Sequence, residues 1–353
     1  MAINNTKILS KKRFWAGVLL AQFLLFYLFS KIDFIIRLAE SFFEKQKAIH
    51  QSLFSKFNFS VGDVFYVLLA VLLIYLILRT VLKRGQRNGV RLLIILNIIY
   101  FSYQIFWGLL YFQDPISEKL PDYEIKLDDA KALSLIYLEK CKRTRAQVQE
   151  DRNGVFKVYD KNLVVEEILR NQKQLPQFLN PKAGSDVDSF KSSLFKDIMS
   201  YTGIYGYYNP FTAEAQYNPK LPSTHLPFTL AHESAHQLGY AREQEANFIG
   251  YLIGVNSRNM DLKYSTEYFV LKSLLNLIVE QDEKFVKAVI ARYSPGMKRD
   301  RLYEIMFRYR HSGVLDSFFG FTNNIFLKTN QQEGSITYSY FNDLLIRYEK
   351  EHQ

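Results

Sequence analysis

Three apolar runs in the first third of the chain constrain its fold more than any other feature. They cover about residues 14–30, 62–82 and 92–112, and they hold almost no charged side chain. A helix needs about 20 apolar residues to cross a bilayer, and an arginine near the end of such a run can extend its head group to the interface. The sequence therefore predicts three transmembrane helices in a membrane module over residues 1–112, followed by a separate domain over residues 113–353.

Basic residues mark one side of these runs. They lie before the first run and between the second and third, where no acidic residue accompanies them: Lys7, Lys11, Lys12 and Arg13, then Arg79, Lys83, Arg84, Arg87 and Arg91. Because cytoplasmic loops are enriched in lysine and arginine, both segments are predicted to be cytoplasmic, and everything after Asp114 is predicted to lie outside the cytoplasm. A cleaved signal peptide is the alternative for the first run, but no small-x-small cleavage site follows it.

Two segments beside these runs are rich in aromatic and aliphatic side chains. Residues 31–60 place apolar residues at roughly helical spacing: Phe34, Ile35, Leu38, Phe42 and Phe43. We expect an amphipathic helix that either lies on the bilayer or packs on the domain. The third run ends in Trp107, Tyr111 and Phe112, which are expected to form an aromatic belt at the membrane surface.

A short motif later in the chain predicts a metal site. Residues 229–254 contain His232-Glu233-x-x-His236. On a helix the two histidines lie about 40° apart around the axis, so both rings leave one face, which suits two corners of a tetrahedral zinc site. Glu233 follows the first histidine, where its carboxylate can reach a zinc-bound water as a general base.

Such a site needs a third protein ligand, and two glutamates follow the motif. On one helix Glu243 and Glu245 point about 200° apart, so only one of them can face the metal. The face of Glu243 continues through small residues, which allow close approach to the histidine helix: Ala246, Asn247, Gly250 and Gly254. We therefore predict Glu243 as the third ligand, with Glu245 as the alternative. His225, seven residues before the first histidine, is a further candidate.

The segment Glu243-x-x-Ala246-Asn247 resembles the Glu-x-x-Ala-Asp element of gluzincin metallopeptidases. In that group the glutamate is the third zinc ligand and the aspartate orients a ligand histidine. The resemblance implies zinc as cofactor and Asn247 as the orienting residue, although an amide lacks the charge that raises ligand basicity. With its three apolar runs, the chain is similar to a bacterial family of membrane-anchored zincin-like proteins. That similarity implies a multi-pass protein of the cytoplasmic (inner) membrane.

The domain is expected to be mostly helical with a small β-sheet. Helices are predicted over residues 127–149, 162–174, 264–293, 297–311, 313–328 and 338–349. Residues 211–218 alternate apolar and polar side chains, which is typical of a strand. Its place before the metal motif matches the edge strand that pairs with substrate in zincins, with Ala213, Glu214 and Ala215 as the substrate-binding residues. An ordinary hairpin strand is the alternative.

Composition excludes several other classes of protein. The net charge of +10 does not indicate a nucleic-acid partner, because much of the basic charge lies beside the apolar runs and no nucleic-acid motif occurs. The single cysteine, Cys141, excludes an internal disulfide and a zinc site built on several thiolates.

The sequence as a whole predicts a membrane-anchored, mainly α protein with a zincin-like domain. It would hydrolyse a peptide or protein substrate outside the cytoplasm, with zinc held by His232, His236 and Glu243. Arg242, His311 and Tyr338 are candidates for stabilising the oxyanion. The alternatives are an intramembrane protease and a non-catalytic, metal-stabilised binding or assembly protein of the cell envelope. Nothing in the sequence indicates an oligomeric state.

Overall fold

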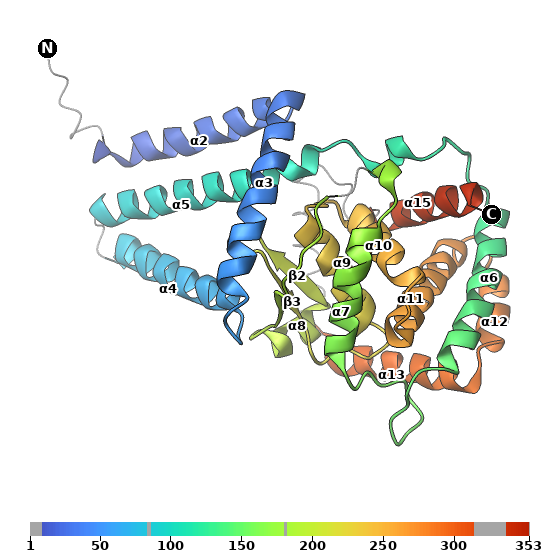
Figure 1. Cartoon of the computed structure of the whole chain (residues 1–353). Helices are drawn as coiled ribbons and strands as arrows, with labels where there is room; N and C mark the ends of the chain where they lie inside the picture. Colours follow the sequence, from blue (N-terminus) through green and yellow to red (C-terminus); the bar gives the residue numbers. More distant parts are fainter. Residues whose placement is uncertain (1–8, 83–85, 180–181, 314–336, 353) are drawn as a thin grey trace, which may run out of the picture.

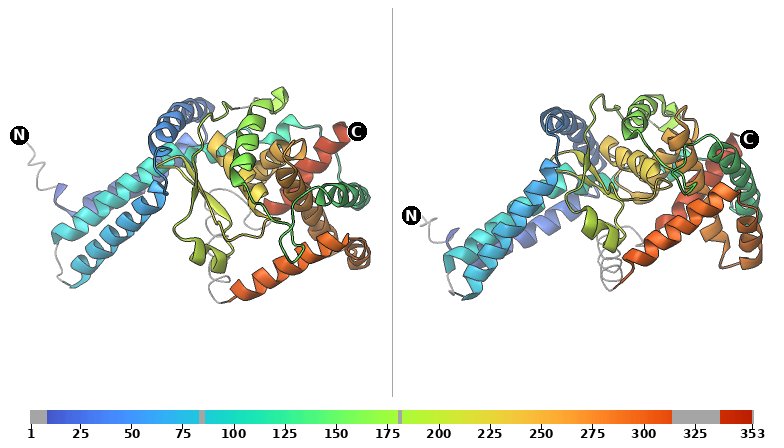
Figure 2. Two further views of the ribbon diagram at one scale, coloured as in Figure 1. Left: turned by 60° about the horizontal axis from the view of Figure 1, so that its bottom comes forward. Right: turned by 90° about the horizontal axis from the view of Figure 1, so that it is seen from below.

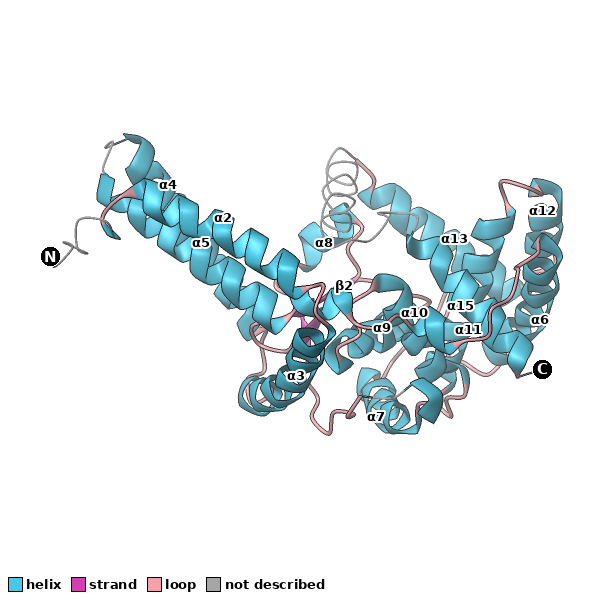
Figure 3. Ribbon diagram, turned by 90° about the horizontal axis from the view of Figure 1, so that it is seen from above, coloured by secondary structure: helices cyan, strands magenta, loops and turns pink. Residues whose placement is uncertain are grey.

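The computed structural model describes residues 9–82, 86–179, 182–313 and 337–352 (Figure 1). It is mainly helical, with one small sheet, and an elongated bundle of helices projects from a larger helical body (Figures 2 and 3). The helix predicted over residues 313–328 lies outside the described residues, except for its first position.

The projecting bundle consists of α2 (Lys12–Phe29), α4 (Val61–Leu82) and α5 (Gln86–Phe106). By length and composition, all three helices are apolar enough to cross a membrane. The prediction that the third run is one helix to residue 112 is wrong. The helix ends at Phe106 and continues as the 3₁₀ turn η1 (Gly108–Phe112), because the side chains that follow are buried against the helical body.

Helix α3 (Asp33–Phe54) lies across the end of this bundle, roughly perpendicular to it (Figure 1). One face, with Ile36, Ala39 and Phe43, is buried, which confirms that this amphipathic segment packs on the rest of the protein. Phe34 and Leu38 on another face are exposed. Packing on the domain therefore accounts for only part of its apolar surface.

The larger body is built from short and medium helices around α9, α10 and α11. Its elements are η2 (Ile116–Lys119), α6 (Leu127–Arg145), α7 (Lys161–Asn171), η3 (Gln172–Gln174), η4 (Gln177–Leu179), α8 (Lys196–Thr202), α9 (Leu226–Leu238), α10 (Glu243–Val255), α11 (Met260–Ile278), α12 (Glu283–Ala291), α13 (Pro295–His311) and α15 (Thr337–Glu351). The prediction of one helix over 264–293 is wrong, because the Asp282 carboxylate accepts a hydrogen bond from Phe285 N and caps a new helix there.

The sheet has three strands in the order β1 (Phe190–Ser192), β3 (Glu214–Tyr217) and β2 (Gly206–Asn209). β3 pairs in parallel with β1 and antiparallel with β2. The predicted edge strand is therefore wrong: Glu214 and Ala215 lie in the central strand β3, which is paired on both sides, and Ala213 just before it is buried as well. The alternation correctly predicted a strand, but the edge position rested on its place before the metal motif, and the polar side chains of β3 are buried as well.

A buried cluster joins the bundle to the body. Its members come from α3, η1, β2 and the loops beside the sheet and α9: Phe43, Trp107, Leu110, Tyr111, Tyr208, Ala213 and Ala241. Trp107 and Tyr111 are only 6% and 5% exposed, so the predicted aromatic belt is wrong for these two residues. The predicted boundary at residue 113 also cuts through continuous packing.

Two buried carboxylates form hydrogen bonds that connect α4 with the sheet and with the residues after β1. Glu214 accepts hydrogen bonds from Val61 N and Gly62 N, at 3.1 and 2.6 Å, and so caps the first turn of α4. Asp63 accepts hydrogen bonds from Ser193 Oγ and Leu194 N, at 3.0 and 2.7 Å. The apolar helix and the sheet are therefore held in one arrangement.

Candidate metal centre

The motif histidines lie on α9, which is almost entirely buried. His225 is the residue before its first turn, and Pro227 lies within that turn, where a missing N–H costs nothing. Gly239 ends the helix with φ of 101°, a left-handed conformation that favours glycine. The chain then turns back directly into α10, which begins at Glu243.

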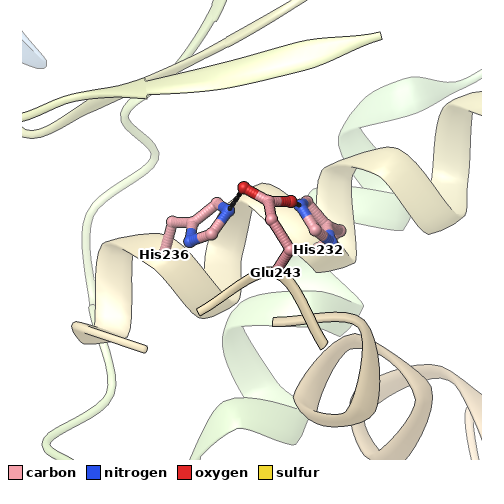
Figure 4. Close-up of side chains that lie close together, drawn as sticks. All are labelled: His232, His236 and Glu243. Atoms are coloured by element: carbon pink, nitrogen blue, oxygen red, sulfur yellow. Dashed lines mark ion pairs between the residues drawn. The ribbon is translucent and has the colours of Figure 1, made fainter. Parts of the chain in front are cut away.

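α10 packs closely on α9 because one of its glycines lies against the α9 backbone. A Cβ atom on Gly250 would lie 3.1 Å from His232 N and 3.3 Å from the carbonyl carbon of Ala231. This contact brings the first residue of α10 up to the two histidines, so His232, His236 and Glu243 converge (Figure 4).

The three side chains have the geometry of a metal-binding group. His232 Nε2 lies 3.3 Å from Glu243 Oε2, and His236 Nε2 lies 3.6 Å from Glu243 Oε1. Two ligand atoms of a tetrahedral zinc are about 3.3 Å apart when each bond is about 2.0 Å long. The side chains of His232 and Glu243 are 14% and 23% exposed, so solvent reaches one side of the group. The residues fit a zinc ion with three protein ligands.

The outer nitrogens of both rings face hydrogen-bond acceptors. His232 Nδ1 lies 2.9 Å from Asn247 Oδ1, and His236 Nδ1 lies 2.7 Å from the carbonyl oxygen of Tyr240. Each Nδ1 therefore carries the proton, and each Nε2 presents its lone pair to the centre of the group, as metal binding requires.

Two imidazole nitrogens and a carboxylate that face one point could hold a cation. Their closeness also shifts the pKa values of the protein without metal. Burial alone would lower the pKa of His236, but its hydrogen bond to Glu243 outweighs burial and raises that pKa to about 9. Burial would raise the pKa of Glu243, and the two histidines hold it below its ordinary value. Both shifts have one cause, the attraction between the Glu243 carboxylate and the two imidazole rings.

Glu233 lies beside this group and does not belong to it. The residue is 3% exposed, and its Oε2 atom has no hydrogen-bond partner among the described residues. Burial raises the pKa of Glu233 to about 7. Gly206 of β2 covers the carboxyl group so closely that a Cβ atom there would lie 2.6 Å from Oε1. Sequence reasoning missed Gly206, because nothing in Tyr-Gly-Tyr-Tyr marks a contact with a residue 27 positions later.

The alternative candidates lie elsewhere. Glu245 Oε1 accepts hydrogen bonds from Ile116 N, at 3.0 Å, and from Arg242, at 2.9 Å, so both residues serve a structural contact. His225 Nε2 lies 3.2 Å from Glu304 Oε1. His311 packs on Tyr201 and its Nδ1 bonds to Phe307 O. None of these four joins the cluster, and the side chain of Tyr338 lies outside the described part of the chain.

Aromatic side chains that follow the end of α5 border the site, and no sequence pattern predicted this. The ring of Trp107 stands edge-on to His236, with 5.8 Å between centroids, and packs on Tyr208 at 4.6 Å. Burial raises the pKa of Tyr111, and its neighbours Tyr103 and Glu243 raise it further. The candidate site therefore borders the apolar bundle.

One protein family matches the chain. The family described as "Protein of unknown function (DUF3810)" matches residues 39–346, which include most of α3, two of the three apolar helices and the whole candidate site. No curated protein and no solved structure matches the chain.

Proposed function

We propose that this chain, which belongs to the DUF3810 family of proteins of unknown function, is a membrane-anchored zinc metallopeptidase of the gluzincin type. The observation that carries the proposal is one arrangement of four side chains. The facing atoms of His232, His236 and Glu243 lie within 4.8 Å of one another. Beside them the buried carboxyl of Glu233 has an oxygen without a hydrogen-bond partner in the described part of the chain. Structural zinc sites usually have four protein ligands, whereas three ligands next to a free carboxyl suit catalysis.

Zinc bound by these three residues would polarise the scissile carbonyl and activate a water molecule. Glu233 takes the proton from that water and passes it to the leaving amine. A carboxyl group whose pKa is raised toward 7 is suited to both transfers, since it can accept and release a proton near neutral pH. Asn247 and the Tyr240 carbonyl hold the two imidazole rings in the orientation that the reaction needs.

β2 takes over the role that the sequence suggested for β3. Its Gly206 lies against Glu233, and no described strand pairs with its other side. An extended substrate chain can add to this free edge through main-chain hydrogen bonds, which places a peptide bond beside the general base. The preference for an extended, unfolded segment follows from this mode of binding.

We further propose that the protein lies in a bacterial inner membrane and that its candidate site is on the side away from the cytoplasm. The first residues of α2 and α5 lie at the same end of the bundle, since Lys12 would contact a Cβ atom on Gly89, and the helical body lies at the other end (Figure 1). The basic residues that flank the apolar helices, among them Lys11, Arg13 and Arg91, belong to this first end. Because such residues favour the cytoplasmic side, the body belongs on the far side.

Substitution of the proposed base tests the function directly. We expect Glu233→Gln in the full chain to fold, keep its zinc and lose hydrolysis of an unfolded polypeptide by about 100-fold or more, the scale of a general base. Glu283→Gln, at an exposed position on α12, is the matched control and should retain full activity. If wild type and Glu233→Gln hydrolyse the polypeptide equally, the protease proposal fails and a non-catalytic, metal-stabilised binding protein becomes the better interpretation.

A further inference from the structure

β2 runs from the proposed general base to an apolar helix. Its first residue, Gly206, lies against the Glu233 carboxyl group. Its last residue, Asn209, lies against the first turn of α4, where a Cβ atom on Gly62 would be 2.4 Å from Asn209 Nδ2. Four residues of extended chain therefore cover the whole way from the base to the apolar bundle, a span of about 13 Å.

The loop after β2 lies among the ends of the apolar helices. The ring of Phe211 packs on Phe65 of α4, with 5.2 Å between centroids, and on Phe106 at the end of α5, at 6.2 Å. Gln46 of α3 donates a hydrogen bond to the carbonyl oxygen of Pro210, at 3.1 Å. The direction of β2 is therefore fixed toward the body-side end of the bundle.

α3 marks the plane of the membrane surface at that end. It lies across the bundle end (Figures 1 and 3). Beside its buried face it carries a stripe of apolar side chains that are 41–68% exposed: Phe34, Leu38, Phe42, Ile49 and Leu53. These positions fall within about 100° of one another around the helix axis. Phe42 of this stripe stacks on Phe106, with 6.1 Å between centroids. An exposed apolar stripe that continues onto three apolar helices fits the interfacial layer of a bilayer.

From this arrangement we infer that the substrate is a polypeptide anchored in the same membrane and cut close to its anchor. The inference rests on the proposed peptidase function. A substrate segment that pairs with the free edge of β2 passes Glu233 at one end of the strand and reaches the membrane surface at the other. Since an extended residue spans about 3.3 Å, the cut lies roughly four to eight residues from the membrane surface.

A pair of anchored substrates tests this geometry. The full chain, loaded with zinc, is placed in vesicles of phosphatidylethanolamine and phosphatidylglycerol together with a substrate that has one apolar transmembrane helix. In the near substrate, an unstructured segment of mixed sequence follows the helix directly. In the far substrate, a flexible Gly/Ser linker of about 40 residues separates the same segment from the helix. Glu233→Gln is run with both substrates.

Tethering alone raises the local concentration of both substrates, so the comparison isolates the direction of β2. We expect the near substrate to be cut at least about tenfold faster than the far one, with cleavage sites found by mass spectrometry roughly four to eight residues from the helix. Equal rates of Glu233-dependent cleavage would overturn the inference and leave the peptidase proposal standing. If neither segment, nor the same segment without an anchor, shows Glu233-dependent cleavage, the peptidase proposal fails and this inference falls with it.

Discussion

Asn247 Oδ1 lies 2.9 Å from Nδ1 of His232, and this contact joins the second turn of α10 to the middle of α9. The amide oxygen can only accept a hydrogen bond, so it selects the imidazole tautomer whose Nε2 lone pair points at Glu243. An amide performs this orientation without adding charge. An aspartate at the same place would also increase the basicity of the ring.

The first prediction concerns this residue. Asn247→Leu keeps the branched arrangement of the side-chain heavy atoms and removes the acceptor, and we expect zinc affinity to fall by about 10- to 100-fold, the usual effect of losing such a partner. Asn247→Asp keeps the acceptor and adds a charge, so it should bind zinc at least as tightly as wild type. Competition with a fluorescent chelator measures both constants, and circular dichroism verifies folding. Equal zinc affinity of Asn247→Leu and wild type would contradict the orienting role.

The second prediction separates the two glutamates at the start of α10. Glu243→Gln removes a proposed ligand, as do His232→Ala and His236→Ala, and each should sharply lower the zinc content of the purified protein. Glu245→Gln keeps an oxygen for the hydrogen bond from Ile116 N, so its zinc content should stay near wild type. Metal analysis that finds Glu245→Gln without zinc and Glu243→Gln with zinc would reverse the assignment.

The third prediction concerns the glycine above the base. Gly206→Ala places a Cβ atom 2.6–2.9 Å from the carboxyl group and Cγ of Glu233, so the side chain must move. A displacement of about 1 Å at a reacting group can cost on the order of 100-fold in rate. We expect hydrolysis to fall by about that factor while zinc content stays unchanged. Gly17→Ala on α2, where no atom lies within 4 Å of the new Cβ, is the control and should be fully active. Normal activity of Gly206→Ala would show that Glu233 is not fixed by β2.

Residue spacing within short segments of the sequence predicts the helices of the candidate site and the side chains that each helix face presents. The helical spacing of the motif and the small residues of α10 are enough to bring His232, His236 and Glu243 together, since Gly250 does lie against the α9 backbone. Whether they bind zinc stays a prediction. The sheet could not be predicted in this way, because strand order depends on pairing between distant segments: Glu214 is central only because Phe190–Ser192 pairs with β3.

The apolar runs illustrate the same limit. Hydropathy predicts three long helices, but it cannot distinguish a tryptophan at a membrane surface from one buried against a domain. Trp107 is buried because α3 and β2 bring Phe43 and Tyr208 to it, at 5.9 and 4.6 Å between ring centroids. Of these two partners, Tyr208 comes from a segment about 100 residues later in the chain.

The fourth prediction concerns the contact between α4 and the sheet. Glu214→Ala leaves Val61 N and Gly62 N without their acceptor in a buried place, and each unsatisfied group costs about 1–3 kcal/mol. We expect a clearly lower unfolding temperature in detergent, whereas Glu214→Gln, which keeps one acceptor oxygen, should lower the unfolding temperature less.

The same contact bears on the domain boundary. A chain that begins at Gln113 lacks Phe43, Trp107 and the start of α4, and we expect it to aggregate. A monomeric, cooperatively unfolding 113–353 chain would show that the predicted domain boundary holds after all.

The last prediction concerns topology. Lys12 and Gly89 lie side by side, so α2 begins and α5 begins at one end of the bundle, and the body that carries the candidate metal centre lies at the other. The basic residues that flank the apolar helices belong to the first end, and such residues favour the cytoplasmic side. A reporter that is active only outside the cytoplasm, fused after Gln353, should therefore be active, and the same reporter inserted within residues 84–90 should be inactive. A reporter that is active only in the cytoplasm should give the opposite pair of results at the same two positions. If both positions report the same side, the three helices do not cross the membrane as proposed, and the direction of β2 toward a bilayer loses its basis.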